Sequence, residues 1–188
     1  MEMSEVIVGT AIRATYIVRG TRGALLCPPH PLMGGSRFDV RLERIAEELH
    51  KVNYSTLTFD YRTPFRGGVG EVEDARSCLL YLKERHDFVA VVGYSFGSVV
   101  ASNVADEADA LVLISPLKRV NEIELKDSKV PKLVVVARYD EIVSFRESEE
   151  IIESLSEPKK VVVLDTDHFY TGKYLELARE VAEFLGGL

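Results

Sequence analysis

The stretch that decides the fold is FVAVVGYSFGSVVASNVA, residues 88–105. Its first five residues are an apolar run typical of a strand that is covered on both faces. Its last part consists of small and apolar residues that suit a helix. Between the two lies the pattern Gly-x-Ser-x-Gly, formed by Gly93, Ser95 and Gly97. A serine at a sharp turn between a strand and a helix is typical of a nucleophile elbow.

The two glycines of this pattern have a steric role. In an elbow the serine backbone is strained, and a side chain at either glycine position would collide with the neighbouring strand or helix. The turn then lifts the Ser95 hydroxyl out of the chain, and the following helix points the N–H of Phe96 at a negative charge developing there. The alternative interpretation is that Ser95 is an ordinary helix-capping serine between turn glycines.

Outside this stretch, apolar runs alternate with helical patterns. Two period-2 stretches, 5–9 and 11–18, predict an antiparallel N-terminal hairpin. Apolar runs that end in turn residues then follow at 24–29, 55–61, 88–95, 110–116, 132–140 and 159–166, and helical stripes at 37–52, 72–82, 99–105, 145–155 and 174–185. This alternation predicts an α/β fold with a mostly parallel twisted sheet and helices on both faces. We expect residues 1–188 to form a single domain, with the site at the carboxyl ends of the strands.

A serine nucleophile needs a general base and an acid that orients it. Enzymes that have a nucleophile elbow carry these groups in the chain order Ser, then Asp or Glu, then His. Only His168 follows Ser95 among the histidines, and it comes just after the last apolar run. Asp140 ends the run 132–140 and is the predicted acid, with Asp165 as the second choice. The ordinary alternatives are a solvated loop histidine and a helix-capping aspartate.

A second N–H for an oxyanion is expected from the loop PPHPLMGGS, residues 28–36. The two glycines of this loop let the chain curl toward Ser95. We expect the N–H of Leu32 to be the donor that acts beside the N–H of Phe96, and His30 to shape the loop. Candidate pocket residues are His30, Met33, Tyr94, Phe169 and Phe65, of which the last four suit the core equally well.

Composition excludes several classes of protein. The net charge is −7 and the basic residues form no cluster, so nucleic acid is not an expected partner. No run approaches the roughly 18 apolar residues of a membrane span, and the start of the chain lacks the positive charge of a signal peptide. We therefore expect a cytoplasmic protein without a membrane partner. Cys27 and Cys78 fit small buried residues, and we expect neither a metal nor another cofactor. The sequence leaves open whether the protein forms a homodimer.

Three segments together resemble the small, capless, dienelactone-hydrolase-like branch of the α/β-hydrolase superfamily. Residues 28–36 are similar to its HPHP-L-x-GG loop, 58–82 to its F-x-x-RG-x-G…G-x-GE-x-ED segment, and 91–101 to its elbow. The chain departs from that pattern at the first His of HPHP, where a proline stands, in a shorter segment after Arg62, and at Ala137, where many relatives have Gly. The resemblance implies Ser95, Asp140 and His168 as the catalytic triad, with Leu32 and Phe96 as oxyanion donors.

The expected reaction is hydrolysis of short to medium acyl esters of soluble small molecules through an acyl-enzyme. Only about 16 residues separate Pro116 from the run that begins at 132, too few for a cap domain. Thioesters, lactones and small peptide amides use the same apparatus and stay open as substrates. The rival interpretations are a cofactor-free perhydrolase or haloperoxidase with the same triad, and a non-catalytic binding protein of the same fold.

Overall fold

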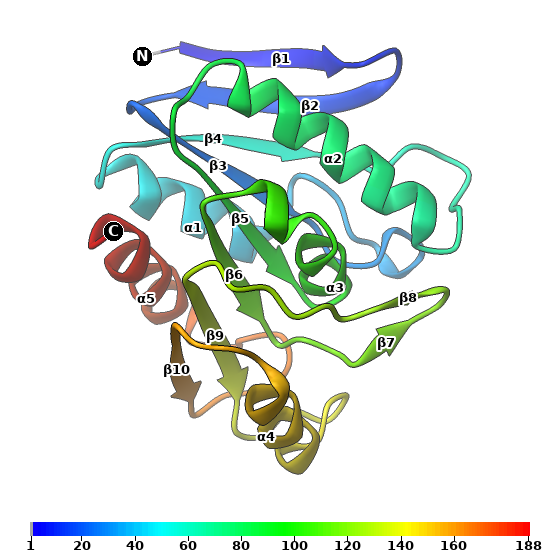
Figure 1. Ribbon diagram of the computed structural model, residues 1–188, viewed down its shortest axis with the longest axis vertical. Helices are drawn as coiled ribbons and strands as arrows, with labels where there is room; N and C mark the ends of the chain where they lie inside the picture. Colours follow the sequence, from blue (N-terminus) through cyan, green and yellow to red (C-terminus); the bar gives the residue numbers. More distant parts are fainter. Residues whose placement is uncertain (1) are drawn as a thin grey trace.

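The computed structural model describes residues 2–188, and its central feature is an eight-stranded sheet (Figure 1). Two antiparallel pairings occur at its N-terminal edge, β1 with β2 and β2 with β4, and the other strands pair in parallel. The predicted parallel sheet with an N-terminal hairpin is therefore confirmed. The strands, in their order across the sheet, are β1 (Glu2–Val8), β2 (Ile12–Val18), β4 (Tyr54–Phe59), β3 (Arg22–Cys27), β5 (Val89–Tyr94), β6 (Ala110–Ile114), β9 (Lys132–Ala137) and β10 (Lys159–Leu164).

Helices cover both faces of the sheet (Figure 1). One face packs against α1 (Val40–His50) and α5 (Tyr174–Gly186), and the other against α2 (Val69–Lys83), α3 (Phe96–Ser102) and α4 (Phe145–Ser154). Two short 3₁₀ turns, η1 (Pro31–Met33) and η2 (Ala105–Glu107), complete the helical elements of the described residues. Every residue of β5 is buried. Burial on both faces explains why this strand is a continuous apolar run in the sequence.

Helix α3 begins earlier than the apolar stripe at 99–105 predicts. Ser95 has a φ of 55°, which ends the strand, and the helix starts at the next residue, Phe96. The helix ends at Ser102, and the Nδ2 of Asn103 donates to the carbonyl of Val99 at 2.8 Å. The elbow, and not the apolar stripe, therefore sets where the helix begins.

A small antiparallel ribbon lies between β6 and β9, where the sequence pattern predicts no element. It consists of β7 (Arg119–Val120) and β8 (Ile123–Glu124). Asn121 occupies its turn with a φ of 53°, in the left-handed region that asparagine tolerates better than most residues. Strands this short carry no hydrophobic period, which is why the sequence pattern missed them.

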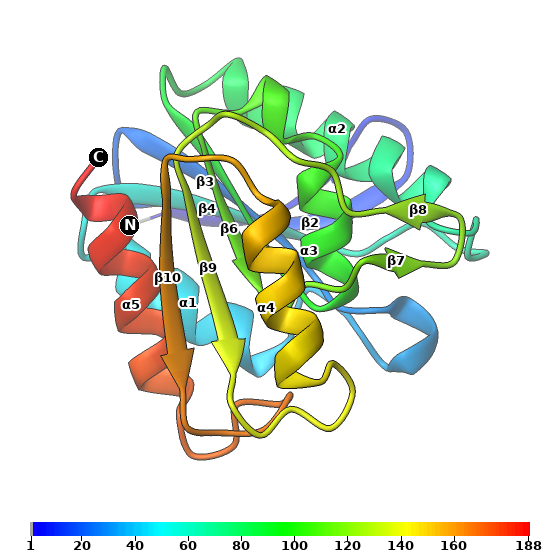
Figure 2. The ribbon, with the colours of Figure 1, turned by 60° about the horizontal axis from the view of Figure 1, so that its bottom comes forward.

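The loops that carry the predicted site residues leave the same edge of the sheet. Parallel strands end at a common edge, and Figure 2 shows the arrowheads of β9 and β10 side by side there. Ser95 follows β5, Asp140 follows β9 and His168 follows β10. The parallel topology therefore brings together three side chains that are far apart in the sequence.

The loop between β4 and α2 is held by two carboxylates that are fully buried on α2. Asp74 accepts hydrogen bonds from the N–H and Nε of Arg62, at 2.8 and 2.7 Å, and from Nη2 of Arg66 at 2.7 Å. Glu71 accepts from the N–H of Arg66 at 3.1 Å. These bonds fix the loop that carries Phe65 toward the site. A buried carboxylate is tolerated only because it is paired in this way.

We expect Asp74→Asn to lower the free energy of unfolding by about 2–3 kcal/mol, because the amide leaves Arg62 without its anion and Arg66 with Glu71 alone. The matched control is Glu73→Gln at the preceding, exposed position, which should leave stability within about 0.5 kcal/mol. Urea unfolding of both variants and the wild type measures the difference. Equal midpoints for the two variants would show that the buried pairing contributes nothing.

Candidate active site

Ser95 lies on a sharp turn that only glycines on either side permit. Its φ of 55° and ψ of −120° form a strained combination for a residue with a side chain. Its N–H donates to the carbonyl of Ile114 on β6 at 2.9 Å. A Cβ added at Gly93 would lie 2.0 Å from the carbonyl oxygen of Gly97, and one added at Gly97 would lie 2.1 Å from that of Cys27. The close approach of strand and helix therefore requires both glycines.

The Ser95 hydroxyl begins a row of hydrogen-bonded side chains. Its Oγ lies 2.9 Å from Nε2 of His168, and Nδ1 of His168 lies 2.7 Å from Oδ2 of Asp140. The other oxygen of Asp140 accepts from the N–H groups of Ile142 and Val143, both at 2.8 Å. The carboxylate only accepts, so Nδ1 carries the proton and Nε2 is left to receive the hydroxyl proton.

Burial and hydrogen bonding act in opposite directions on Asp140. The side chains of His168 and Asp140 are only 4% and 2% exposed. Burial alone would raise the pKa of Asp140, but hydrogen bonds from His168, Val143 and Ile142 outweigh it and hold that pKa below its ordinary value. The carboxylate is therefore ionised beside the imidazole, where it stabilises a positive charge.

Asp165, the second choice for the acid, does not reach His168. Its carboxylate accepts from Nε of Arg138 at 2.7 Å, and its side chain is 65% exposed. One oxygen of Asp140 binds His168, and the other accepts from N–H groups of the following turn. Asp140 is not the helix cap of the alternative interpretation, because Ser144 caps α4. The structure therefore places Asp140, and not Asp165, at the imidazole.

The expected oxyanion donor Leu32 lies elsewhere. Its side chain is exposed and its N–H donates to Nδ1 of His30 at 3.2 Å, because the 3₁₀ turn that starts at Pro31 carries Leu32 outward. The carbonyl of His30 accepts from the N–H groups of Met33 and Gly35, both at 3.0 Å. The N–H of His30 itself donates to no group within residues 2–188. Of these two backbone groups, the N–H of Leu32 is therefore occupied, whereas that of His30 has no partner in the described residues.

A pocket of about 300 Å³ opens beside Ser95. His30, Met33, Tyr94 and Phe169 all line it. Phe65 does not, because its ring packs against those of His30 and Phe96, with centroids 4.6 and 6.0 Å apart. Lining residues that the sequence analysis did not single out include Asp39, Arg41, Leu117, Val120 and Ile142.

The missed lining residues had only weak signals in the sequence. Asp39 and Arg41 follow the loop 28–36 directly, and that position was the one available sign that they would face the site. They pair with each other, and the guanidinium of Arg41 lies 4.5 Å from the ring centroid of Tyr94. Val120 belongs to the β7–β8 ribbon, whose strands are too short to show a hydrophobic period in the sequence.

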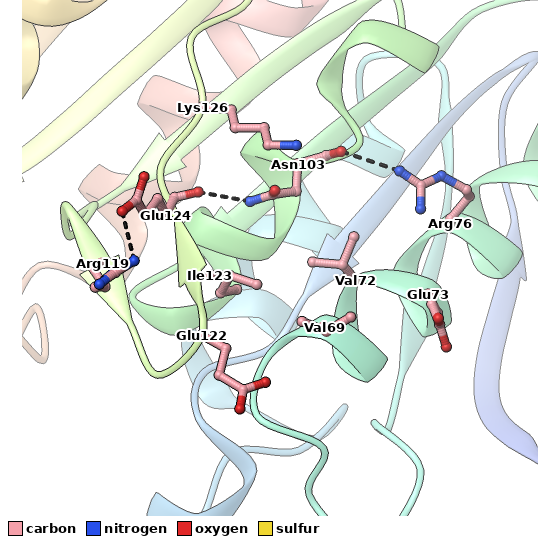
Figure 3. Close-up of a pocket in the computed structure, with 10 residues that line it drawn as sticks. All are labelled: Val69, Val72, Glu73, Arg76, Asn103, Arg119, Glu122, Ile123, Glu124 and Lys126. Carbon is pink, nitrogen blue, oxygen red and sulfur yellow. Dashed lines mark hydrogen bonds and ion pairs between the residues drawn. The ribbon is translucent and has the colours of Figure 1, made fainter.

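A second hollow, of about 570 Å³, lies between α2 and the outer side of the ribbon (Figure 3). Its lining residues are Val69, Val72, Glu73, Arg76, Asn103, Arg119, Glu122, Ile123, Glu124 and Lys126. None of them is a serine, threonine, cysteine or histidine, so this hollow contains no hydroxyl or thiol beside an imidazole of the kind that Ser95 and His168 form. The described residues also contain no group of three or more His, Cys, Asp or Glu side chains arranged to hold a metal ion. Among residues 2–188, no helix is long enough and apolar enough to cross a membrane.

The mostly parallel sheet, the strained serine after its central strand and the histidine and aspartate from later loops define a protein of the α/β-hydrolase fold. The family model of the dienelactone hydrolase family matches residues 44–172. The chain belongs to this family and is a hydrolase. None of the curated proteins matches the sequence.

Solved structures of α/β hydrolases share the fold over almost the whole chain. An α/β serine hydrolase without a lid from Xanthomonas campestris superposes with a TM-score of 0.84 at 21% identity, covering 98% of this chain and 94% of that one. A serine hydrolase homologue from Coxiella burnetii gives 0.81 at 23%, covering 97% and 96%. An esterase from Pyrococcus furiosus gives 0.78 at 19%, covering 98% and 91%. At these identities the likeness concerns the fold.

We expect Gly97→Ala to lower the free energy of unfolding by about 2–4 kcal/mol, because its methyl group would meet backbone oxygen atoms that cannot move aside. The control is Gly187→Ala at the end of α5, where an added Cβ would meet nothing closer than 3.4 Å. Urea unfolding of both variants tests this. A Gly97→Ala protein as stable as the control would show that the elbow tolerates a side chain.

Proposed function

We propose that this hydrolase cleaves short to medium acyl esters of soluble small molecules through an acyl-enzyme intermediate. The observation that carries the proposal is the row from Ser95 through His168 to Asp140, in which Ser95 and His168 line a pocket. A serine hydroxyl, an imidazole whose Nε2 faces that hydroxyl and a buried carboxylate are the groups that acyl transfer needs.

In the first half of the reaction, Oγ of Ser95 attacks the ester carbonyl as Nε2 of His168 takes its proton. A carbon–oxygen bond forms, and the carbonyl π electrons move to the oxygen. The imidazolium stays paired with Asp140. When the tetrahedral intermediate collapses, the bond to the alcohol breaks and His168 gives its proton to the leaving oxygen. The acyl group is now an ester of Ser95.

In the second half, water replaces the alcohol. His168 removes a proton from the water as its oxygen attacks the acyl carbonyl, and the new tetrahedral intermediate expels Oγ of Ser95, which takes the proton back. The products are a carboxylic acid and the free hydroxyl of Ser95. His168 therefore acts as base and acid once in each half.

Two backbone N–H groups are proposed to hold the oxyanion. The N–H of Phe96 begins α3 and has no partner in the preceding turn of a helix. The N–H of His30 donates to no other group of the described chain, and the His30 residue lines the pocket with Ser95. Each such donor contributes on the order of 3–4 kcal/mol of transition-state stabilisation.

The proposed substrate size follows from the pocket and from what surrounds it. The pocket volume of about 300 Å³ is at the small end for ligand sites. Between β6 and β9 the chain forms only the β7–β8 ribbon, so this segment supplies no cap domain over Ser95. Among the similar structures, the Pyrococcus protein is an esterase and the Xanthomonas protein has no lid, which supports an open ester site.

Lactone hydrolysis is a second candidate, favoured by the family to which the chain belongs. The same steps apply, except that the alcohol oxygen stays attached to the acyl group after the ring opens. Comparison of lactones with open-chain esters of equal carbon number would rank the two candidates.

The first test is hydrolysis of p-nitrophenyl esters of increasing acyl length by the wild type and by Ser95→Ala. We expect wild-type activity to fall as the acyl chain outgrows the pocket, and the variant to lose about 10⁴-fold or more in kcat because the nucleophile is gone. Ser102→Ala, in the same helix, is the control and should keep wild-type rates. Equal rates for Ser95→Ala and the wild type would rule out the proposed nucleophile.

A second test separates the two acids. Asp140→Asn should reduce kcat by about 10⁴-fold, because an amide that donates to Nδ1 of His168 leaves the proton on Nε2, where the base is needed. Asp165→Asn should change kcat by less than about twofold, since it removes only an exposed ion pair. Kinetics on one shared ester measure both variants. A larger loss for Asp165→Asn would contradict the assignment of the acid.

A further inference from the structure

The β7–β8 ribbon stands between the two hollows of the molecule. Val120 lines the pocket at Ser95, whereas the neighbouring Arg119 and the residues of β8 line the larger hollow (Figure 3). The ribbon is therefore a wall of the active site with open space behind it. Its distance from Ser95 depends on the bonds that hold it.

The β8 side of the ribbon is tied on the side of the larger hollow. At its base, Nδ2 of Asn103 donates to the carbonyl of Glu124 at 2.9 Å, as Figure 3 shows. At its tip, the N–H of the turn residue Glu122 donates to the carbonyl of Gly67 at 2.9 Å. On the pocket side, the tip of the ribbon is held by the Asn121 side chain, whose Oδ1 lies 2.9 Å from Nε2 of His30.

The hydrogen bonds of His30 settle which of its nitrogen atoms carries the proton. The N–H of Leu32 can only donate, so Nδ1 of His30, 3.2 Å away, accepts and carries no hydrogen. In a neutral ring the hydrogen is then on Nε2, which donates it to Asn121. One imidazole, that of His30, therefore joins the loop 28–36 to the tip of the ribbon.

The His30 ring is also fixed from its faces. Its centroid lies 4.6 Å from that of Phe65 and 4.7 Å from that of Phe96. Phe65 belongs to the loop that the buried Asp74 holds in place through Arg62 and Arg66. The ring therefore has a rigid support, and the bond to Asn121 transmits that rigidity to the ribbon.

We propose that the hydrogen bond between His30 and Asn121, called here the ribbon latch, sets the width of the pocket and so selects the acyl group. The proposal rests on the ester hydrolysis proposed above. With the latch closed, Val120 stays close to Ser95 and favours small acyl groups. With the latch broken, the β7 side of the ribbon, which carries Val120, moves away from Ser95 about the β8 side, which stays tied through Glu122 and Glu124, and longer acyl groups fit. The His30 and Asn121 side chains are thus positioning residues that do not touch the reacting atoms.

The turn at Asn121 offers two well-matched variants. Its φ of 53° suits glycine, so Asn121→Gly removes the amide without straining the turn. Asn121→Asp keeps an acceptor oxygen at the same place and preserves the latch. A general loss of stability would affect both variants, whereas loss of the latch affects only the glycine variant.

The experiment measures kcat and KM for p-nitrophenyl acetate and octanoate with the wild type and both variants at pH 8. For Asn121→Gly we expect the ratio of kcat/KM, octanoate over acetate, to rise roughly three- to tenfold, as loss of one hydrogen bond implies. The rise should come mainly from a lower KM for octanoate. Asn121→Asp should stay within about twofold of the wild-type ratio.

A variant of the other partner completes the cycle. The shorter side chain of His30→Asn still accepts from the N–H of Leu32, as in an Asx turn, but does not span the distance to Asn121. Because His30→Asn also removes part of the pocket wall, its ratio should rise at least as far as that of Asn121→Gly. Adding Asn121→Gly to His30→Asn should change the ratio by less than about twofold, because the latch is already absent. An unchanged ratio in an active Asn121→Gly enzyme, or additive effects, would overturn the latch alone. A wild type that hydrolyses no ester would overturn the proposed function and the latch with it.

Discussion

The structure depends on the close approach of α3 to the ends of β5 and β3, which Gly93 and Gly97 allow. With no Cβ at either position, the helix begins one residue after Ser95 and its first N–H lies beside the hydroxyl. The same approach places the chain after β3 against the elbow, since the carbonyl of Cys27 is what a side chain at Gly97 would strike. One steric condition thus sets the backbone strain at the serine, the start of the helix and the position of the loop 28–36.

The parallel order of the strands brings Asp140 and His168 together. Strands β9 and β10 are neighbours that end at the same edge, so Asp140 and His168 emerge side by side although 28 residues separate them. Burial then gives their hydrogen bond its effect, because water does not compete for either side chain. Asp140 can stay ionised at such a buried place because two backbone N–H groups bind its second oxygen. The loop after β9 therefore supplies both the carboxylate that binds His168 and the N–H groups that keep this carboxylate charged.

The features that the sequence predicts well are those that come from regular elements. The apolar runs predict the strands, the glycine pattern predicts the elbow, and chain order places Asp140 and His168 at strand ends. The features that it misses depend on the directions of individual side chains. A 3₁₀ turn directs Leu32 outward, and the N–H of Leu32 donates to the imidazole of His30. The sequence pattern predicts neither of these features. The ribbon at 119–124 has strands of two residues each, too short for a period. From the sequence, Asp165 and Asp140 are both candidates for the carboxylate that binds His168. In the structure, Asp165 binds Arg138 instead.

These two kinds of feature also have different energetic consequences. The serine, histidine and aspartate are held by the sheet, and moving one of them would require repacking a core that is close-packed. The pocket walls come from irregular segments that are held by single hydrogen bonds, each of which contributes roughly 1 kcal/mol. A substitution at a wall therefore changes the shape of the pocket at little cost to the fold, whereas a substitution at the elbow affects both. Because the two sets of contacts are separate, this fold can keep one reaction mechanism while its range of substrates changes with a few loop residues.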